Sequence, residues 1–219
     1  MSAGRAKRMP RARRWVLMAG AVVGMTIAMT GCEGQTVAPT GDELYAQARE
    51  LYFSYREVTN GVLERIDPGP WEVGSSYGME PSAAGCGDGW KFALSRSTTV
   101  DPADQPAMRE AVTEYLTSAG YDVEGQDVGA DGAVAREVVV EKQDPFSSLR
   151  VTFATSGNVL VTATTRCMPG DIGELDERLF GDAVLAEGYL PRTESPSDPL
   201  FFGITPGEPG FLPTPTPTP

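Results

Sequence analysis

The stretch YDVEGQDVGADGAVAREVVVEKQDPFSSLRVTFATSGNVLVTATTRC, residues 121–167, decides the fold of this chain. It is rich in β-branched and aromatic residues, and turn signals divide it. The four predicted strands are Tyr121–Val128, Val134–Lys142, Leu149–Thr155 and Val159–Cys167. The turns between them are Gly129-Ala130-Asp131-Gly132, Asp144-Pro145 and Ser156-Gly157-Asn158. Because parallel neighbours need a crossover of a dozen or more residues, these strands are expected to pair antiparallel.

A long amphipathic helix is predicted ahead of this sheet. Thr40-Gly41-Asp42-Glu43 has the pattern of a capping box at a helix start, and Asp67-Pro68-Gly69-Pro70 ends the helix. Between them, apolar residues recur at spacings of three and four and predict one buried stripe. The stripe consists of Leu44, Ala48, Leu51, Tyr52, Tyr55, Val58, Val62, Leu63 and Ile66.

Two short strands and a second helix are predicted between the long helix and the sheet region. The strands are residues 71–77 and 90–94, and the helix begins at Asp101-Pro102 and stops at Gly120. The predicted order is therefore α-β-β-α-β-β-β-β. Two amphipathic helices need an apolar surface, which one face of an antiparallel sheet provides. We predict an α+β domain over residues 41–168, with two helices packed on an antiparallel sheet.

The first 31 residues have the pattern of an export signal. Six basic residues, from Arg5 to Arg14, precede an apolar run from Trp15 to Met29, and this segment has no acidic residue. The run is shorter than the roughly 20 residues that span a bilayer, so a removed signal peptide over residues 1–31 is expected. Arg13-Arg14 also fits a twin-arginine export signal, as an alternative to the general route.

The end of this signal, Met29-Thr30-Gly31-Cys32, resembles the bacterial lipobox. The resemblance implies cleavage between Gly31 and Cys32 and a diacylglyceryl thioether on Cys32. The alternative is an ordinary signal peptide that happens to precede a cysteine. Residues 32–40 would form a lipidated tether spanning roughly 16 Å. The chain is then expected at the cell membrane, lipid-anchored on the extracytoplasmic face.

Cys86 and Cys167 are the two cysteines that remain once Cys32 is lipidated. An exported protein meets an oxidising compartment, so this pair is expected to form a disulfide that braces the domain. The alternative is two buried, inert thiols. No Cys-x-x-Cys motif is present, which favours a structural bridge over a redox role.

The C-terminal part of the sequence is predicted to contribute little to the fold. Residues 169–190 have weak helical spacing at Leu175, Leu179, Val184 and Leu185, interrupted by Gly181, and form a marginally helical extension. From Pro191 to Pro219, nine of 29 residues are proline, and the chain ends in alternating Pro and Thr. We expect an extended Pro/Thr-rich disordered tail over residues 191–219.

Composition excludes several kinds of chemistry. The chain has no histidine, which removes Ser-His-Asp and Cys-His catalysis and His-ligated zinc. The segment from Asp127 to Val138 looks like a calcium loop, but it lacks an acid at the third position and has Val138 where a bidentate Glu is required, so a hairpin explains it better. After residue 31 there are twelve basic and 30 acidic residues, a net charge of −18 that disfavours nucleic-acid binding. No catalytic residue, metal site or cofactor is predicted.

Several of these features together resemble the LppA-type lipoproteins of actinobacteria. They are the lipobox, the capped long helix, the turn Asp67-Pro68-Gly69-Pro70-Trp71, Cys86, the helix end Ala119-Gly120-Tyr121, Cys167 in a late strand and the Pro/Thr tail. The resemblance implies a membrane-anchored domain that bears a disulfide, with no catalytic residues to transfer.

Three functions follow as hypotheses. The first is a non-catalytic binding or accessory module of the cell envelope, whose partner is an envelope protein or an apolar ligand. The second is a carrier or sensor for an apolar ligand held in a cavity between helices and sheet. The third is a hydrolase that uses two converging carboxylates. We do not expect an enzyme, because 30 acidic residues guarantee carboxylate pairs without identifying one.

Overall fold

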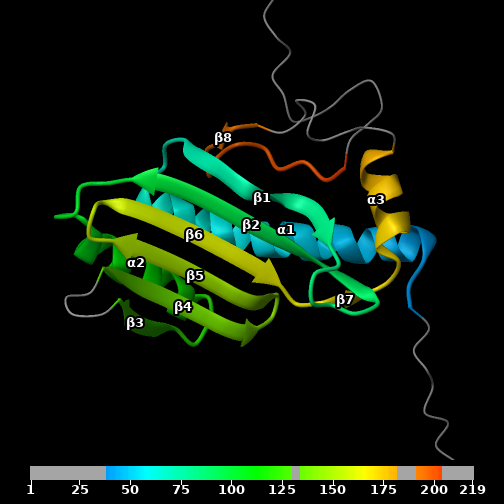
Figure 1. The fold of residues 1–219 in the computed structure, drawn as a ribbon, viewed down its shortest axis with the longest axis horizontal. Helices are drawn as coiled ribbons and strands as arrows, with labels where there is room; N and C mark the ends of the chain where they lie inside the picture. The colour runs from blue at the N-terminus through cyan, green and yellow to red at the C-terminus, as the bar shows by residue number, and fades with distance from the viewer. Residues whose placement is uncertain (1–37, 130–133, 182–190, 204–219) are drawn as a thin grey trace, which may run out of the picture. The chain divides into compact units, whose positions relative to one another are not determined.

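A computed structural model describes residues 38–129, 134–181 and 191–203 (Figure 1). Every described residue belongs to one compact unit, Val37–Pro219. The predicted signal peptide, its cleavage site and Cys32 lie outside the described residues, as do residues 204–219 of the predicted tail. Among the described helices, none has the length and apolar character needed to cross a bilayer.

Three helices and eight strands make up the described part of the chain. The helices are α1 (Gly41–Ile66), α2 (Gln105–Ser118) and α3 (Ile172–Phe180). The strands are β1 (Trp71–Ser82), β2 (Gly89–Thr99), β3 (Glu124–Val128), β4 (Ala135–Gln143), β5 (Phe146–Ala154), β6 (Asn158–Thr165), β7 (Met168–Pro169) and β8 (Thr193–Glu194). The predicted α+β class is confirmed, and the predicted order holds through β6.

The strands form one antiparallel sheet in the order β3-β4-β5-β6-β2-β1-β8, and β7 pairs with the start of β2. The four predicted strands of residues 121–167 are consecutive neighbours, β3 to β6, as short turns require. The β3–β4 hairpin, in which Val128 lies opposite Ala135, confirms the hairpin interpretation of the Asp127 segment. β2 then pairs with β6, which places the early strands beside the late ones.

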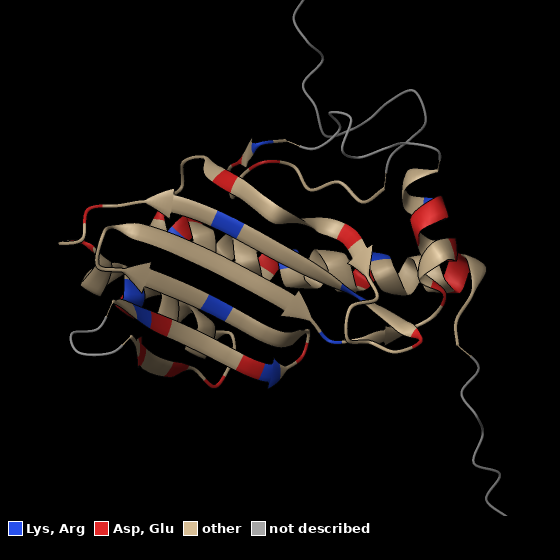
Figure 2. Ribbon diagram, viewed as in Figure 1, with Lys and Arg blue, Asp and Glu red and all other residues tan. Residues whose placement is uncertain are grey.

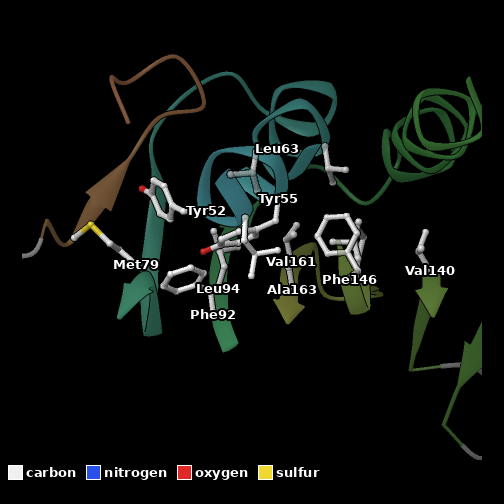
Figure 3. Packing of buried hydrophobic residues seen from close by; sticks show 14 of the residues in the cluster. Tyr52, Tyr55, Leu63, Met79, Phe92, Leu94, Val140, Phe146, Val161 and Ala163 are labelled. Carbon is white, nitrogen blue, oxygen red and sulfur yellow. The ribbon is translucent and has the colours of Figure 1, made fainter. Parts of the chain in front are cut away.

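The core lies between the sheet and the helices α1 and α2, which cover the same face in Figure 1. Every residue of the predicted α1 stripe is buried except Val58, which is half-buried. The stripe meets Phe92 and Leu94 of β2 and Val161 of β6, as Figure 3 shows. The two helices approach closely at Gly61, where a Cβ would lie 2.1 Å from the Tyr115 hydroxyl oxygen.

The opposite face of the sheet is turned toward the viewer in Figure 1, and no described helix crosses it. Small polar side chains line its centre, where Ser95 of β2 lies opposite Thr162 of β6, and Thr162 lies opposite Arg150 of β5. Figure 2 shows that β6 itself carries no charged residue. This alternation of apolar and polar faces is typical of an antiparallel sheet with one solvated side.

The capping of α1 and the start of α2 differ from the prediction. α1 begins after Thr40 as predicted, but the Thr40 side chain makes no capping hydrogen bond; instead the Gly41 N–H donates to the Glu174 carboxylate of α3. α2 begins at Gln105, because residues 101–104 form a turn in which the Asp104 N–H donates to the Asp101 carbonyl. At α1 a partner distant in the sequence thus satisfies the backbone, whereas ahead of α2 a local turn at Asp101 does so. Gly120, with φ +92°, follows the end of α2 as predicted.

The predicted domain boundary at residue 168 is wrong. The extension predicted as marginal contains the full helix α3, whose Leu175 and Leu179 are completely buried in the common core. The tail predicted as disordered begins with β8, which pairs with Trp71 and Glu72 of β1. The described domain therefore runs to residue 203. The reason is tertiary, because these segments are held by partners distant in the sequence; residues 182–190 lie outside the description.

Candidate functional site

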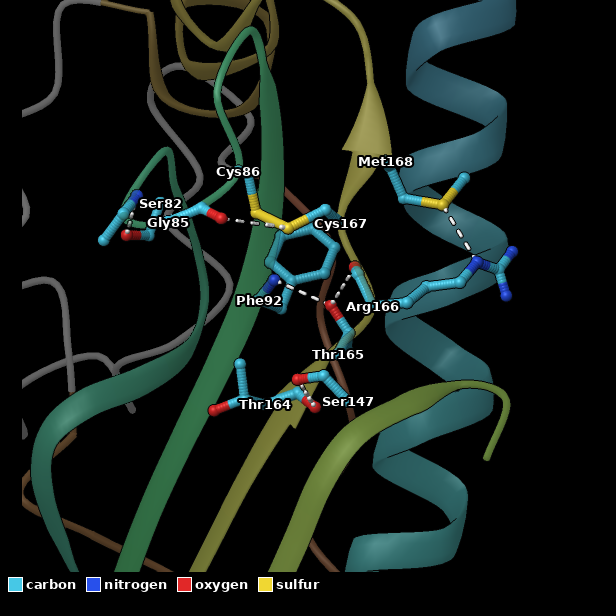
Figure 4. The surroundings of a disulfide bond; sticks show 11 residues. Ser82, Gly85, Cys86, Phe92, Ser147, Thr164, Thr165, Arg166, Cys167 and Met168 are labelled. Atoms are coloured by element: carbon cyan, nitrogen blue, oxygen red, sulfur yellow. Dashed lines mark hydrogen bonds between the residues drawn. A yellow bond between two sulfur atoms is a disulfide. The ribbon is translucent and has the colours of Figure 1, made fainter. Parts of the chain in front are cut away.

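The disulfide is the predicted site that the structure confirms. Cys86 precedes β2 and Cys167 follows β6, and their sulfur atoms are bonded with Cα atoms 5.5 Å apart (Figure 4). The pairing of β2 with β6 brings the two cysteines together. Beside them, the Thr165 hydroxyl accepts a hydrogen bond from the Phe92 N–H, 3.0 Å away. The bridge thus closes the end of the sheet where these two strands stop pairing.

A second feature, which the sequence analysis missed, begins with irregularities in β1. The pairing of β1 with β2 shifts register between Val73 and Tyr77 and again between Tyr77 and Pro81. Gly78 lies within the second of these shifts and has φ +105°. A Cβ at this position would lie 3.0 Å from Arg56 Nη1 and 3.1 Å from the Tyr55 hydroxyl. Such bulges leave backbone groups without ladder partners. Glycine here allows polar side chains of α1 to reach β1.

Arg96 and Tyr55 satisfy the carbonyl groups that this irregular backbone presents. The Arg96 guanidinium donates to the Ser76 carbonyl at 3.1 Å and to the Tyr77 carbonyl at 2.7 Å. The Tyr55 hydroxyl donates to the Gly78 carbonyl. Arg96 follows Phe92 and Leu94 on the inner face of β2, so its charge is inside the domain.

Glu194 of β8 joins this arginine to a second one on α1. Its Oε1 accepts from Arg56, and its Oε2 lies 2.9 Å from Arg96 Nη2. The side chains of Arg56, Arg96 and Glu194 are only 4%, 1% and 13% exposed. We call these three residues the arginine–glutamate cluster. The cluster connects residues 191–203 to α1 and β2.

The cluster has more positive than negative charge. Two guanidinium groups share one carboxylate, and the Nε atoms of Arg56 and Arg96 are both buried without a hydrogen-bond partner among the described residues. Burial lowers the pKa of Arg56, but the Glu194 carboxylate and nearby tyrosines raise it more strongly, so the net change is upward. Arg56 therefore stays charged at any physiological pH.

A pocket of about 630 Å³ lies against the cluster, bounded by α1, β1, β2 and residues 191–201. This is within the size range of ligand pockets in proteins. Its apolar and aromatic lining includes Tyr52, Val73, Tyr77, Met79, Leu200 and Phe201, and its charged lining consists of Arg56, Arg96, Arg192, Glu194 and Asp198. Figure 3 shows Tyr52 and Met79 at the β1 side of the core.

Residues 191–203 form the outer wall of this pocket, and we call them the C-terminal strap. Phe202 holds the strap through ring contacts with Tyr45 and Tyr52, at centroid distances of 5.2 and 5.3 Å. The Asn60 side chain donates to the Pro196 carbonyl at 3.1 Å, and the Gly203 N–H lies 3.3 Å from the Met79 sulfur. The strap is thus fastened at both ends and in the middle.

A wider groove of about 930 Å³ lies between α2, β3 and β4. Its lining is more exposed than that of the pocket at the arginine–glutamate cluster. Most of its residues are exposed, and charges of both signs alternate along it, among them Arg109, Glu114 and Arg136. Neither of its arginines is buried, and its one largely buried carboxylate, Glu137, is paired with Arg150. The pocket at the arginine–glutamate cluster is therefore the candidate site of the described domain.

Part of this site had a sequence signal and part had none. Arg56 lies four residues after Tyr52 on the buried stripe, and Arg96 continues the alternation of Phe92 and Leu94, so an arginine at a core position is the signal for both. Glu194 lies in a polar, proline-rich stretch with no periodic pattern. The described residues contain no group of three acidic or cysteine side chains placed to hold a metal ion.

Comparison of the chain with protein families, with curated proteins and with solved structures gives no match. The resemblance to LppA-type lipoproteins stays a prediction.

The buried tyrosines beside the cluster predict a loss of stability in alkali. Burial raises the pKa of Tyr55 far above its usual value, and burial also raises that of Tyr52, which neighbouring Arg56 partly opposes. Unfolded tyrosine ionises near pH 10 and the folded groups do so at higher pH, so their stabilisation is complete below pH 10 and is lost above it. Tyr55, which stays protonated in the folded domain over this range, is expected to lower the free energy of unfolding by about 1.4 kcal/mol per pH unit above 10.

Urea unfolding of residues 33–219 between pH 8 and pH 11.5 measures this slope. This fragment holds the whole compact unit Val37–Pro219 and only the two bonded cysteines. Tyr55→Phe removes one ionisable group. It is expected to make the fall of the free energy of unfolding with pH less steep by about 1.4 kcal/mol per pH unit above 10. An identical slope in both proteins would contradict the assignment to Tyr55.

Proposed function

We propose that this chain is a lipoprotein anchored on the extracytoplasmic face of the cell membrane, whose domain is a non-catalytic binding module of the cell envelope. The basic residues, the apolar run and Met29-Thr30-Gly31-Cys32 support export and lipidation. The observation that carries the binding function is the 630 Å³ pocket with the buried arginine–glutamate cluster in its wall. A pocket that combines apolar walls with a few fixed polar groups is typical of ligand sites.

The chemistry of the pocket supports binding over hydrolysis. Glu194 and Asp198 are its carboxylates. Both oxygens of Glu194 are engaged by arginines, and Asp198 Oδ2 accepts from the Ser195 N–H at 2.7 Å. A carboxyl group that acts as acid, base or nucleophile must reach the substrate with a free oxygen, and Glu194 has both oxygens bound to arginines. The hydrolase hypothesis therefore receives no support from these two residues.

The same pocket also bears on the carrier hypothesis. In the centre of the core, Tyr55 and Phe92 are stacked at a centroid distance of 6.0 Å. The pocket lies instead at the β1 edge, under the C-terminal strap. A carrier for a wholly apolar ligand would have to place it against two buried arginines, so a ligand with a polar group suits the site better.

Cys32→Ser tests the anchoring. The wild-type protein, expressed from its own signal in a bacterial host, is expected in the membrane fraction as a chain that begins at Cys32 and carries the added mass of a diacylglyceryl group. The variant lacks the thiol that accepts the lipid, so it is expected to carry no such mass and not to be cut after Gly31. Intact-protein mass spectrometry distinguishes the two products. An unlipidated wild-type chain in the culture fluid would overturn the proposal.

Native mass spectrometry of the detergent-extracted protein tests the binding function. We expect a bound species that survives purification and disappears on denaturation. The two-dalton difference between the oxidised and reduced protein serves as an internal check that the Cys86–Cys167 bridge, and hence the domain, is intact. A correctly lipidated, intact protein that consistently lacks any bound species would count against a binding module and leave the anchor unaffected.

A further inference from the structure

The charge of the pocket is opposite to that of the domain. After residue 31 the chain has a net charge of −18, yet the charged residues that line the pocket are three arginines and two acids. Two of those arginines are nearly inaccessible to water. Burying a charge without a partner is costly, so an excess positive charge at this place needs a reason.

Part of the reason is structural, and it applies to Arg96 alone. Arg96 donates to the carbonyls of Ser76 and Tyr77 as well as to Glu194, so removing it would leave the irregular part of β1 unsatisfied. Arg96 and Glu194 by themselves would make a neutral pair. Arg56 has no such backbone role in the described contacts: it donates to Glu194 and Asn60, and its guanidinium lies over the Tyr52 ring, 5.8 Å from the centroid. Arg56 is therefore the source of the excess charge.

Arginine pairs of this kind suit one class of chemical group. The planar guanidinium binds carboxylates and phosphates through paired hydrogen bonds, and it does so more strongly where water is excluded. The rest of the wall is apolar, with Tyr52, Val73, Met79 and Leu200 around the charged patch. A ligand complementary to both parts has an anionic head and an apolar body.

We propose that this pocket binds an amphipathic anion, with a carboxylate or phosphate head beside Arg56 and Arg96 and an apolar body against Tyr52, Met79 and Leu200. The inference rests on the proposed binding function and specifies its ligand class. Glu194 fixes the two arginines, and the ligand supplies the second negative charge that the cluster lacks. The membrane next to an anchored domain contains such molecules, as free fatty acids and as phosphate-bearing lipids.

Isothermal titration calorimetry of residues 33–219 with four probes of equal chain length tests the proposal. The probes are octanoate, octyl phosphate, octanol and octylammonium, each with a chain of eight carbon atoms. The head of octanoate includes one of these carbons, so its apolar body is one carbon shorter, and tighter binding than octanol cannot come from the body. Either anion is expected to bind at least tenfold more tightly than octanol, and octylammonium more weakly still. Octanoate alone would indicate a fatty-acid type of ligand, octyl phosphate alone a phosphate-bearing lipid, and both would indicate the shared anion chemistry.

Arg56→Met locates the binding in this pocket. Methionine keeps much of the buried stem, and the remaining Arg96–Glu194 pair is neutral, so the variant is expected to fold and to bind the anions at least tenfold more weakly. Arg56→Lys keeps the charge and is expected to recover part of the affinity. Arg65→Met, the same substitution at an exposed position of α1 away from the pocket, is expected to bind as the wild type does.

The outcomes separate this proposal from the broader one. Equal binding of octanol and octanoate, or unchanged anion binding in Arg56→Met, would overturn the anion site while leaving a binding module for apolar ligands. Absence of binding by all four probes would also overturn it. Should Arg56→Met fail to fold, the affinities of the wild-type protein for the four probes still show whether the pocket prefers an anion. The anchor is judged separately, by the mass on Cys32.

Discussion

Replacing Glu194 with alanine is expected to lower the free energy of unfolding by about 3–5 kcal/mol. The substitution removes the one carboxylate that compensates Arg56 and Arg96, whose side chains are 4% and 1% exposed. Both charges would then remain buried without a counterion, which is far more costly than the loss of a surface ion pair. Urea unfolding of residues 33–219 at pH 7 measures the difference.

Glu72→Ala is the matched control for this variant. Glu72 lies on the same edge of the sheet, opposite Thr193 of β8, but its side chain is exposed. Its replacement is expected to change the free energy of unfolding by no more than about 0.5 kcal/mol. A loss below about 1 kcal/mol in Glu194→Ala would show that water reaches the cluster and screens it.

The same variant reports on the C-terminal strap. Glu194 is one of several contacts that hold the strap, together with the β8–β1 pairing, Asn60 at the Pro196 carbonyl and Phe202 on the aromatic residues of α1. Without the carboxylate the strap loses its bonds to the two buried arginines, so proteolysis near residues 191–200 is expected to become faster than in Glu72→Ala. Equal proteolysis rates in the two variants would mean that the remaining contacts are sufficient to hold the strap.

The elements with strong periodic patterns could be predicted from the sequence. The stripe from Leu44 to Ile66 specifies α1, since residues three and four apart share one face. Short turns between residues 121 and 167 specify the antiparallel order of β3 to β6. The disulfide followed from the number of cysteines and from the expected compartment, and the pairing of β2 with β6 then brought Cys86 and Cys167 into range.

The parts that were missed depend on contacts between distant segments. The segment of α3 was predicted to be marginal because its helical spacing is weak and Gly181 interrupts it, yet Leu175 and Leu179 are buried by packing on other elements. The strap was predicted to be disordered from its proline content. It is ordered through Glu194 and Phe202, single side chains whose partners lie more than 90 residues away. Local propensity contains no information about such partners.

The candidate site follows from the same missed contacts. Its walls come from α1, β1 and β2, which were predicted, but its closing wall is the strap, which was not. An arginine on a buried stripe, such as Arg56, is visible in the sequence, whereas its counterion Glu194 is not. The pocket is formed by α1, β1 and β2 together with the strap, so it could not be located before the topology was known.

Removing the disulfide with the double substitution Cys86→Ser/Cys167→Ser is expected to lower the free energy of unfolding by about 4.5 kcal/mol. The bridge joins residues 81 positions apart, so in the unfolded chain it restrains a loop that includes β2 to β6. That is a large share of the roughly 5–15 kcal/mol by which a typical domain is stable. Urea unfolding at pH 7 measures the loss, and the slope against urea is expected to rise because the unfolded chain expands.

Two comparisons show whether this loss arises in the unfolded state. Cys167 is exposed and Cys86 is half-buried, so serine at these positions buries no new unsatisfied polar group, and the folded state is expected to change little. A reductant is then expected to lower the stability of the wild type to that of the double variant, while leaving the variant unchanged. Equal stability of variant and oxidised wild type would contradict the loop-closure argument. The β1–β2–β6 pairing, the buried stripe of α1 and the strap would then be sufficient to hold the domain without the bridge.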